Sequence, residues 1–206
     1  MPRKPKIKYI IGVDEAGRGP LAGPIAFGAF LIENKKIDNR KLKFLFKGAR
    51  DSKKMTARKR EEIFAKIKRV GQRNLVEYVV VMQSARSIDS RGLSWVINDC
   101  IGKCLKRLGA NPKETLVLLD GGIKAPKKFI FQKTIIRGDD TELVISLASI
   151  CAKVTRDAHM MELSKKYPKY GLDKHKGYGT LTHRVAIKRH GPSPIHRKTF
   201  LKRTLL

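Results

Sequence analysis

The stretch I-I-G-V-D-E-A-G-R-G, residues 10–19, organises the expected fold of this 206-residue chain. The apolar run 9–13 is typical of a buried strand, and the carboxylates Asp14 and Glu15 follow it directly. A carboxylate at the end of a buried strand needs compensation of its charge, and Mg²⁺ prefers clustered oxygen ligands. The stretch therefore predicts a metal site beside a glycine-arginine-glycine clamp for phosphate or sugar, although an Asp-Glu pair is also typical of a turn or a helix cap.

A second stretch repeats this pattern. The apolar run 116–119 ends in Asp120, which two glycines follow. Carboxylates at the ends of two parallel strands converge at one edge of a sheet, so we expect Asp14 and Asp120 to lie close together. Asp139 and Asp140 precede an expected helix, where the helix dipole favours negative charge. For one of these two aspartates, that is the role we expect.

The composition is strongly basic. Lys and Arg number 46 against 18 acidic residues, which gives a net charge of +28 and indicates a polyanion such as nucleic acid as the partner. No apolar run has transmembrane length, no signal peptide is evident and no long basic amphipathic helix indicates membrane binding. Three cysteines without zinc-finger spacing predict buried reduced thiols, and hence a protein of the reducing cytoplasm: Cys100, Cys104 and Cys151.

Periodicity and capping residues predict alternating strands and helices. We expect an antiparallel hairpin from the first two strands, and helix N-caps at Thr56, Ser90 and Thr180. The expected strands are 9–14, 25–32, 75–82, 116–120 and 129–136, and the expected helices are 57–70, 91–108, 142–166 and 180–190. No element is predicted for residues 35–47. The chain 1–206 is expected to form one domain, with a basic lead-in 1–8 and a basic C-terminal tail 195–206.

Seven sequence blocks, in this order, resemble the ribonuclease HII family, the type 2 ribonucleases H. They are D-E-A-G-R-G-P-L-A-G at 14–23, D-S-K-K at 51–54, L-D-G at 119–121, G-D at 138–139, A-S-I-C-A-K-V-T-R-D at 148–157, H-K-G-Y-G-T at 175–180 and G-P-S-P-I-H-R at 191–197. Any one block is a weak signal, whereas the ordered set is specific. Cys151 and Asp140 depart from the family pattern, and Asp140 leaves open which aspartate is the fourth carboxylate. Gly138 aligns Asp139 best with that role.

The resemblance implies a ribonuclease H-like α/β fold. Its mixed five-stranded sheet would have three antiparallel and two parallel strands, flanked by helices, with extra C-terminal helices. It also implies an endonuclease that hydrolyses the RNA strand of RNA–DNA hybrids. Such an enzyme nicks duplex DNA on the 5′ side of an embedded ribonucleotide and leaves 3′-hydroxyl and 5′-phosphate ends. It would act in ribonucleotide excision repair and RNA primer removal, as a monomer and without a membrane.

The residues that carry over by motif fall into metal-binding and substrate-binding sets. Two divalent ions, Mg²⁺ or Mn²⁺, need several carboxylates, and four negative charges match theirs: Asp14, Glu15, Asp120 and Asp139. By resemblance, Gly17, Arg18 and Gly19 sense the ribose 2′-hydroxyl. Tyr178 stacks on the deoxyribose that follows the ribonucleotide. Phosphate contacts are expected from Lys53, Lys54, Lys153 and Arg156, while Asp157 would pair with a neighbouring cation and the histidines would have no catalytic role.

Two other interpretations remain at this point. A non-catalytic RNA-binding module would explain the charge of +28, but not four carboxylates beside glycines at strand and loop ends. The related ribonuclease HIII prefers longer RNA tracts, and its members carry an additional N-terminal domain and a Gly-Lys-Gly motif. Here eight residues precede the first expected strand and the motif is Gly17-Arg18-Gly19, which favours ribonuclease HII.

Overall fold

A computed structural model of the chain describes residues 6–34, 39–49 and 55–202. Its centre is a five-stranded sheet in the order β3-β2-β1-β4-β5. The strands are β1 (Tyr9–Ala16), β2 (Ile25–Glu33), β3 (Glu77–Gln83), β4 (Thr115–Asp120) and β5 (Gln132–Ile135). β1, β2 and β3 pair antiparallel, and β4 and β5 run parallel to β1. The predicted mixed sheet and its first hairpin are therefore confirmed.

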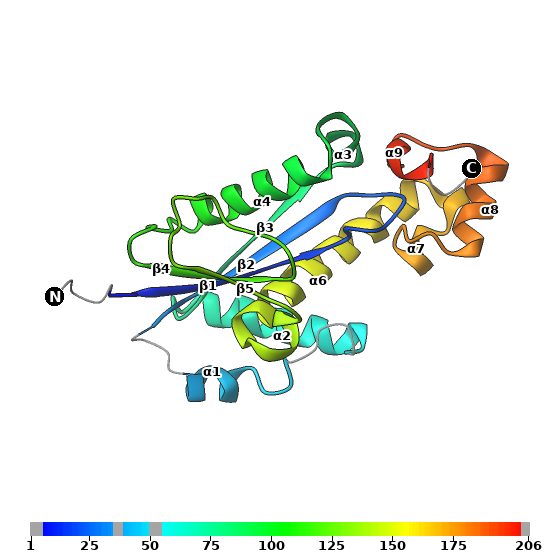
Figure 1. Ribbon diagram of the computed structural model, residues 1–206. Coiled ribbons are helices and arrows are strands. Elements are labelled where there is room, and N and C mark those ends of the chain that lie inside the picture. The colour runs from blue at the N-terminus through cyan, green and yellow to red at the C-terminus, as the bar shows by residue number, and fades with distance from the viewer. Residues whose placement is uncertain (1–5, 35–38, 50–54, 203–206) are drawn as a thin grey trace.

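Helices cover both faces of this sheet (Figure 1). α3 (Ala85–Arg91) and α4 (Leu93–Arg107) lie on one face, where α4 packs on β2 and β3. α2 (Ala57–Gly71) and the long α6 (Leu143–Lys166) form the other apolar core, beside α1 (Asn39–Leu45). The remaining helices are α5 (Gly138–Thr141), η1 (Pro168–Tyr170), α7 (Leu172–His175), α8 (Leu181–His190) and α9 (Lys198–Leu201). This is the three-layer arrangement expected of an α/β protein.

α6 lies unusually close to the two central strands. A side chain at Gly12 would overlap the backbone of Val144, and one at Gly28 would overlap the carbonyl of Ala148. Small residues of the helix, Ala148 and Ala152, are buried at this contact. Glycines in the strands and small residues in the helix thus bring α6 onto the sheet beside the end of β1, which carries the first carboxylates.

Several helix boundaries differ from the sequence predictions. The predicted helix 91–108 corresponds to α4, which begins at Leu93, because Gly92 has a φ of 81° and separates α4 from α3. α3 itself was not predicted. The cap predicted at Ser90 is wrong, because Ser90 lies within α3, whose N-cap is Ser84, and Gly92 precedes α4. The predicted long helix 142–166 is confirmed as α6. Glu142 has extended backbone and separates α6 from the short α5, which carries Asp139 and Asp140. α1 was not predicted, whereas the caps at Thr56 and Thr180 are confirmed.

The C-terminal helices pack as a group at one end of the molecule (Figure 1). Their small apolar core joins Leu172, Ile187 and Leu201 to Leu21 and Met160. Residues 195–202, predicted as a basic tail, are part of this group, since His196 and Arg197 are buried. The loop between β1 and β2 reaches the same group: the Leu21 N–H donates to Gly177 O at 2.8 Å. The fold thereby holds the first strand end beside the segment that carries Tyr178.

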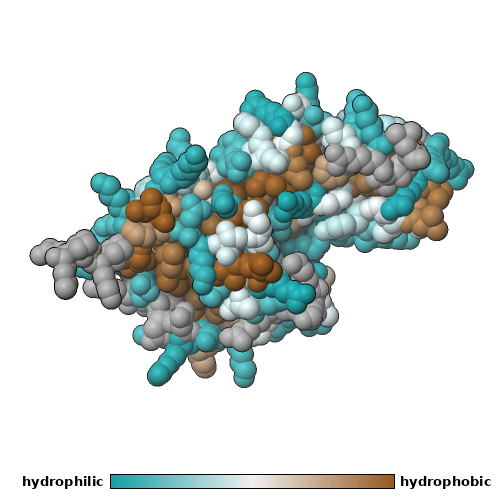
Figure 2. Space-filling view, viewed as in Figure 1, coloured by the Kyte–Doolittle hydropathy of each residue, from teal (hydrophilic) through white to brown (hydrophobic). Residues whose placement is uncertain are grey.

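Figure 2 shows hydrophilic side chains projecting around the outline of the face that it draws, while hydrophobic residues gather over its centre. All three cysteines are buried and free, which confirms their prediction as thiols. In the part of the chain that the structure describes, no helix combines the length and apolar character needed to cross a bilayer.

Candidate active site

A cavity of about 450 Å³ gathers residues from widely separated parts of the sequence. The end of β1 and the following loop form one wall, and the end of β4, α2, α6 and the segment before α8 form the others. Its lining residues are Asp14, Glu15, Ala16, Gly17, Arg18, Gly19, Arg60, Asp120, Ser149, Lys153 and Tyr178. Three of the four predicted carboxylates, the predicted glycine-arginine-glycine clamp and the predicted tyrosine therefore face one space.

Asp14 is the most deeply buried carboxylate of the cavity, with 3% of its surface exposed. Its Oδ1 accepts a hydrogen bond from the Glu15 N–H at 2.7 Å, and its Oδ2 is buried without a hydrogen bond within the described residues. The pKa of Asp14 is raised to about 8, mainly by burial and also by the charges of Glu15 and Asp120, while the nearby Ser149 side chain acts in the opposite direction. A cation between these oxygens would relieve the repulsion.

Asp120 links the end of β4 to the helix that carries Asp139. Its Oδ1 accepts a hydrogen bond from the Gly138 N–H at 2.6 Å, at the first residue of α5. Asp139 is 2% exposed, whereas Asp140 is half-buried. Asp139 is therefore the aspartate of this pair that the fold turns inward, although it does not line the cavity itself.

The donor set suits a hard divalent cation, because carboxylate oxygens are its preferred ligands and Asp14 supplies a buried oxygen without a donor. Among the described residues, no group of three or more His, Cys, Asp or Glu side chains is arranged as a ready-made metal site. Of the four predicted carboxylates, three line the cavity and the fourth, Asp139, is buried beside it. Binding of cations would have to bring the four carboxylates closer together.

Two buried arginines hold the loop after β1. The Arg197 guanidinium donates to the carbonyls of Gly17, Arg18 and Gly23 at 2.6–3.1 Å. Arg156 is completely buried and donates to the carbonyls of Ala22, Pro24 and Lys176 at 2.8–3.3 Å. The phosphate contact predicted for Arg156 therefore needs correction. Its helix turns this side chain under the loop, where it joins the loop to the segment before Tyr178.

The other predicted substrate-binding residues differ in their placement. Tyr178 lines the cavity with 43% of its surface exposed, and the Lys153 ammonium lies 5.8 Å from its ring centroid. Lys153 also pairs with Asp157 at 2.9 Å, which confirms the structural ion pair predicted for Asp157. Arg18 is exposed and lies 3.7 Å from Glu15. Lys53 and Lys54 lie outside the described residues.

Comparisons with known proteins identify the family. The sequence model of ribonuclease HII matches residues 11–204. Ribonuclease HII of Caldicellulosiruptor bescii is 40% identical over 198 residues, which cover 96% of this chain and 89% of the relative. The chain belongs to the ribonuclease HII family.

Solved structures of this family and of its sister family have the same fold. The ribonuclease H2 of Pyrococcus horikoshii matches with a TM-score of 0.71 and 27% identity, covering 93% of both chains. The ribonuclease HII in a PCNA complex from Archaeoglobus fulgidus matches with a TM-score of 0.74 and 21% identity, covering 96% of this chain and 95% of that one. A Bst ribonuclease HIII solved with Mn²⁺ has a TM-score of 0.67 at 16% identity and covers 98% of this chain and 70% of that one.

Sequence reasoning missed two residues of the ribonuclease HII cavity. Ser149 lies one helical turn before Lys153 on α6, and this spacing places both on one helix face. That spacing was a usable signal. No sequence signal identified Arg60, because it is one of many cations in α2 and such a group is typical of a solvent-exposed helix face. The fold brings it to the cavity, where its Nη1 donates to the Met55 carbonyl at 2.6 Å.

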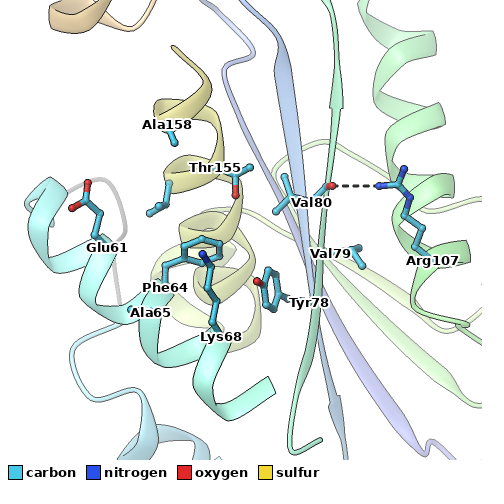
Figure 3. A pocket seen from close by; sticks show the side chains of 11 residues that line it. Glu61, Phe64, Ala65, Lys68, Tyr78, Val79, Val80, Arg107, Thr155 and Ala158 are labelled. Atoms are coloured by element: carbon cyan, nitrogen blue, oxygen red, sulfur yellow. Dashed lines mark hydrogen bonds between the residues drawn. The ribbon is translucent and has the colours of Figure 1, made fainter. Parts of the chain in front are cut away.

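A larger cavity of about 720 Å³ lies elsewhere, between α2, the edge strand β3 and α6 (Figure 3). Phe64 and Tyr78 lie in it with their rings 5.5 Å apart, and Arg107 donates to the Val80 carbonyl at 3.5 Å beside it. Glu61 is the single carboxylate of its lining. Its chemistry does not suit a pair of cations, so the smaller, acidic cavity is the candidate active site.

Proposed function

We propose that this chain hydrolyses the RNA strand of RNA–DNA hybrids and nicks duplex DNA 5′ of a single embedded ribonucleotide, leaving 3′-hydroxyl and 5′-phosphate ends. The family assignment supports ribonuclease HII activity. The observation that carries the finer proposal is the shared cavity, in which carboxylates, the loop of residues 17–19 and Tyr178 meet. The first group suits phosphodiester hydrolysis, and the other two suit the reading of sugars.

In this proposal Asp14, Glu15, Asp120 and Asp139 hold two divalent ions, Mg²⁺ or Mn²⁺. When bound, such a pair activates a water molecule and stabilises the leaving oxyanion. The chain contributes the buried oxygen of Asp14 and the fixed carboxylate of Asp120. The net charge of +28 surrounds this acidic centre with cations that attract the nucleic acid backbone, with Lys153 in the cavity wall itself.

The loop of residues 17–19 is proposed to select ribose. Gly17 has a φ of 87°, and its carbonyl and that of Arg18 are turned inward to the Arg197 guanidinium. With these carbonyls held inside, the loop presents other main-chain groups to the cavity, where a 2′-hydroxyl would distinguish RNA from DNA. Gly19 is exposed and has open space at its Cα, so a sugar meets no side chain there.

Tyr178 is proposed to select the deoxyribose that follows. Its ring faces the same cavity from a segment between Gly177 and Gly179. A ring lies flat on a deoxyribose, whereas a ribose would push its 2′-hydroxyl into the ring. Together, the two elements would select a ribonucleotide followed by a deoxyribonucleotide.

The test is cleavage of three duplexes with one ribonucleotide, four ribonucleotides or none, with Mg²⁺ or Mn²⁺ and with mapped product ends. We expect a nick 5′ of the single ribonucleotide, cuts within the tract and no cut in the all-DNA duplex. Cleavage confined to the tract would favour the specificity of ribonuclease HIII. Binding of all three duplexes without cleavage would favour a non-catalytic binding module.

A further inference from the structure

Three histidines lie beneath Tyr178. His183 and His196 are buried, His175 is half-buried, and the rings of His175 and His183 stack with centroids 4.3 Å apart. All six ring nitrogens have a hydrogen-bond partner. Such a cluster resembles a metal site in composition, but its nitrogens are already engaged, so its chemistry is that of a hydrogen-bond network.

The backbone groups at the two ends of this network fix the position of every proton. The Ser193 N–H can only donate, and it lies 3.0 Å from Nδ1 of His196. The Ser193 hydroxyl lies 2.9 Å from the same nitrogen and can rotate its proton towards it. That nitrogen must therefore accept, and the proton of the neutral imidazole sits on Nε2. His196 Nε2 lies 3.2 Å from Nε2 of His183, which must accept in turn. The proton of His183 is thus on Nδ1, and it is donated to the Tyr178 carbonyl at 2.9 Å.

The result is a relay with one direction, from the Ser193 N–H through His196 and His183 to the Tyr178 carbonyl. Either histidine, if protonated, would place two N–H groups against each other at 3.2 Å, so the relay requires both to be neutral. Burial lowers the pKa of His183 to about 4 and lowers that of His196 as well, which keeps both neutral near pH 7.

A second histidine contact holds the other side of the tyrosine. The Gly177 N–H donates to Nδ1 of His175 at 3.2 Å, and Nε2 of His175 donates to the Tyr170 carbonyl at 2.8 Å. The Tyr178 N–H itself donates to the His175 carbonyl at 2.9 Å. The exposed ring of Tyr178 is therefore carried by a main-chain segment that is anchored on both sides.

The start of the relay also positions the other substrate-reading element. Arg197, the neighbour of His196, binds the carbonyls of Gly17 and Arg18, and its N–H donates to Leu21 O at 2.8 Å. Residues 193–197 thus contact the ribose-reading loop directly and are linked to Tyr178 through two imidazoles. The distance between that loop and Tyr178 determines which two adjacent sugars the protein can contact at once.

We propose that His183 and His196 are positioning residues that set Tyr178 against the ribose-reading loop, and so contribute to the choice of the cleavage site. This inference rests on the proposed role of Tyr178 in reading the RNA-to-DNA junction. It assigns a positioning role to the histidines of the H-K-G-Y-G-T and G-P-S-P-I-H-R blocks. In this role they act through Tyr178 and not by contact with substrate or metal.

Two variants of one residue separate the two halves of the relay. In His183→Asn the amide lies where Nδ1 was and retains the donor to Tyr178. In His183→Gln the amide lies where Nε2 was and retains the contact to His196 alone. The readout is the ratio of kcat/KM on a duplex with one ribonucleotide to that on a uniform RNA–DNA hybrid. We expect His183→Gln to lower this ratio roughly three- to tenfold, as loss of a buried hydrogen bond implies, and His183→Asn to change it less than twofold, about the limit of such comparisons.

The control is Ile101→Ala, which removes buried volume from the core under α4 and should lower the melting temperature without changing the ratio. The relay would be overturned if Ile101→Ala lowered the ratio as much as His183→Gln does. It would also be overturned if His183→Asn and His183→Gln lowered the ratio equally. Tyr178→Ala separates the two proposals: if it leaves the ratio unchanged, the junction-reading role itself fails. If it lowers the ratio but His183→Gln does not, only the relay fails.

A measurement on the unmodified protein completes the test, whatever the variants do to folding. Long-range ¹H–¹⁵N correlations of the imidazoles at pH 7 should show His183 with its proton on Nδ1 and His196 with its proton on Nε2. A proton on Nε2 of His183, or on Nδ1 of His196, would contradict the direction of the relay.

Discussion

The Gly138 N–H donates a 2.6 Å hydrogen bond to Oδ1 of Asp120. This bond ties the beginning of α5, and with it the buried Asp139, to the end of β4. A side chain at Gly138 would overlap the end of the Ile145 side chain and crowd Ile135, so the close approach favours glycine. The two aspartates, 19 positions apart in sequence, are held as parts of one acidic centre by this bond between the Asp120 carboxylate and the main chain next to Asp139.

Asp120→Asn is expected to abolish most turnover while leaving duplex binding nearly intact. The amide keeps an oxygen for the Gly138 N–H, so the fold should persist, but the ions lose charge compensation worth several kcal/mol. At a factor of ten per 1.36 kcal/mol, we expect kcat to fall at least about a hundredfold. Cleavage with Mg²⁺ and duplex binding are measured side by side. Asp140→Asn, at the half-buried neighbour, is the control and should retain activity. Near-normal cleavage by Asp120→Asn would rule out this metal site.

Binding of a duplex should weaken steeply with salt. The net charge of +28 implies that several phosphates are neutralised on binding, and each contributes a slope of about 0.9 to the plot of log affinity against log salt. Titrations between low and moderate salt, with metal absent to prevent cleavage, give that slope. Affinity that does not respond to salt would contradict a backbone-binding surface.

Gly17→Ala and Gly19→Ala should differ in their effect on stability. Gly17 has a φ of 87°, and a Cβ there would overlap the Arg156 side chain, whose guanidinium is held by three carbonyls. Such strain costs about 1–3 kcal/mol, which corresponds to a melting temperature lower by several degrees in a chain of this size. A Cβ at Gly19 meets nothing within 4 Å, so that variant should keep its melting temperature. Equal melting temperatures for the two variants would show that the loop is not fixed as described.

Tyr178→Ala should slow cutting at a single embedded ribonucleotide by about tenfold to a hundredfold, because a lost stacking contact costs roughly 1–3 kcal/mol. Uniform hybrids offer no deoxyribose at that position and should lose much less. The measurement is the rate of each substrate in the variant relative to the parent. The same loss on both substrates would show that the ring does not read the junction.

Stability should fall as the pH is lowered from about 6.5 towards 4. The pKa of His183 is lowered to about 4, mainly by burial and secondarily by the charges of His175 and His196, while the unfolded chain keeps a pKa of about 6.5. The unfolded state therefore binds more protons in this range, and the stabilisation from neutral His183 is complete above pH 6.5 and is lost as the pH falls. Urea midpoints across this range provide the measurement. The stability advantage of the parent over His183→Asn should shrink on acidification, and a constant difference would contradict the assignment.

The fold and the main site residues could be predicted from the sequence because their signals are local. Buried strands that end in Asp14 and Asp120 are visible as apolar runs followed by carboxylates, and Thr56 and Thr180 mark helix starts by their side-chain chemistry. α3 was not predicted, and the cap expected at Ser90 lies inside it, whereas Ser84 caps α3. The positive φ of Gly92, which separates α3 from α4, is a backbone feature that the apolar pattern does not report.

The sequence by itself determined which chemistry is present: carboxylates at two strand ends, a glycine-arginine-glycine loop, a tyrosine between glycines and a large excess of cations. Only the tertiary structure decided where side chains of one helix point. On α6, Ser149 and Lys153 face the cavity, while Arg156 turns beneath the loop and binds three carbonyls. It also decided that three histidines lie beneath Tyr178 and that Arg197 holds residues 17 and 18. Hydrogen bonds between residues so far apart in the chain leave no periodic pattern, since the partner of each group is set by packing alone.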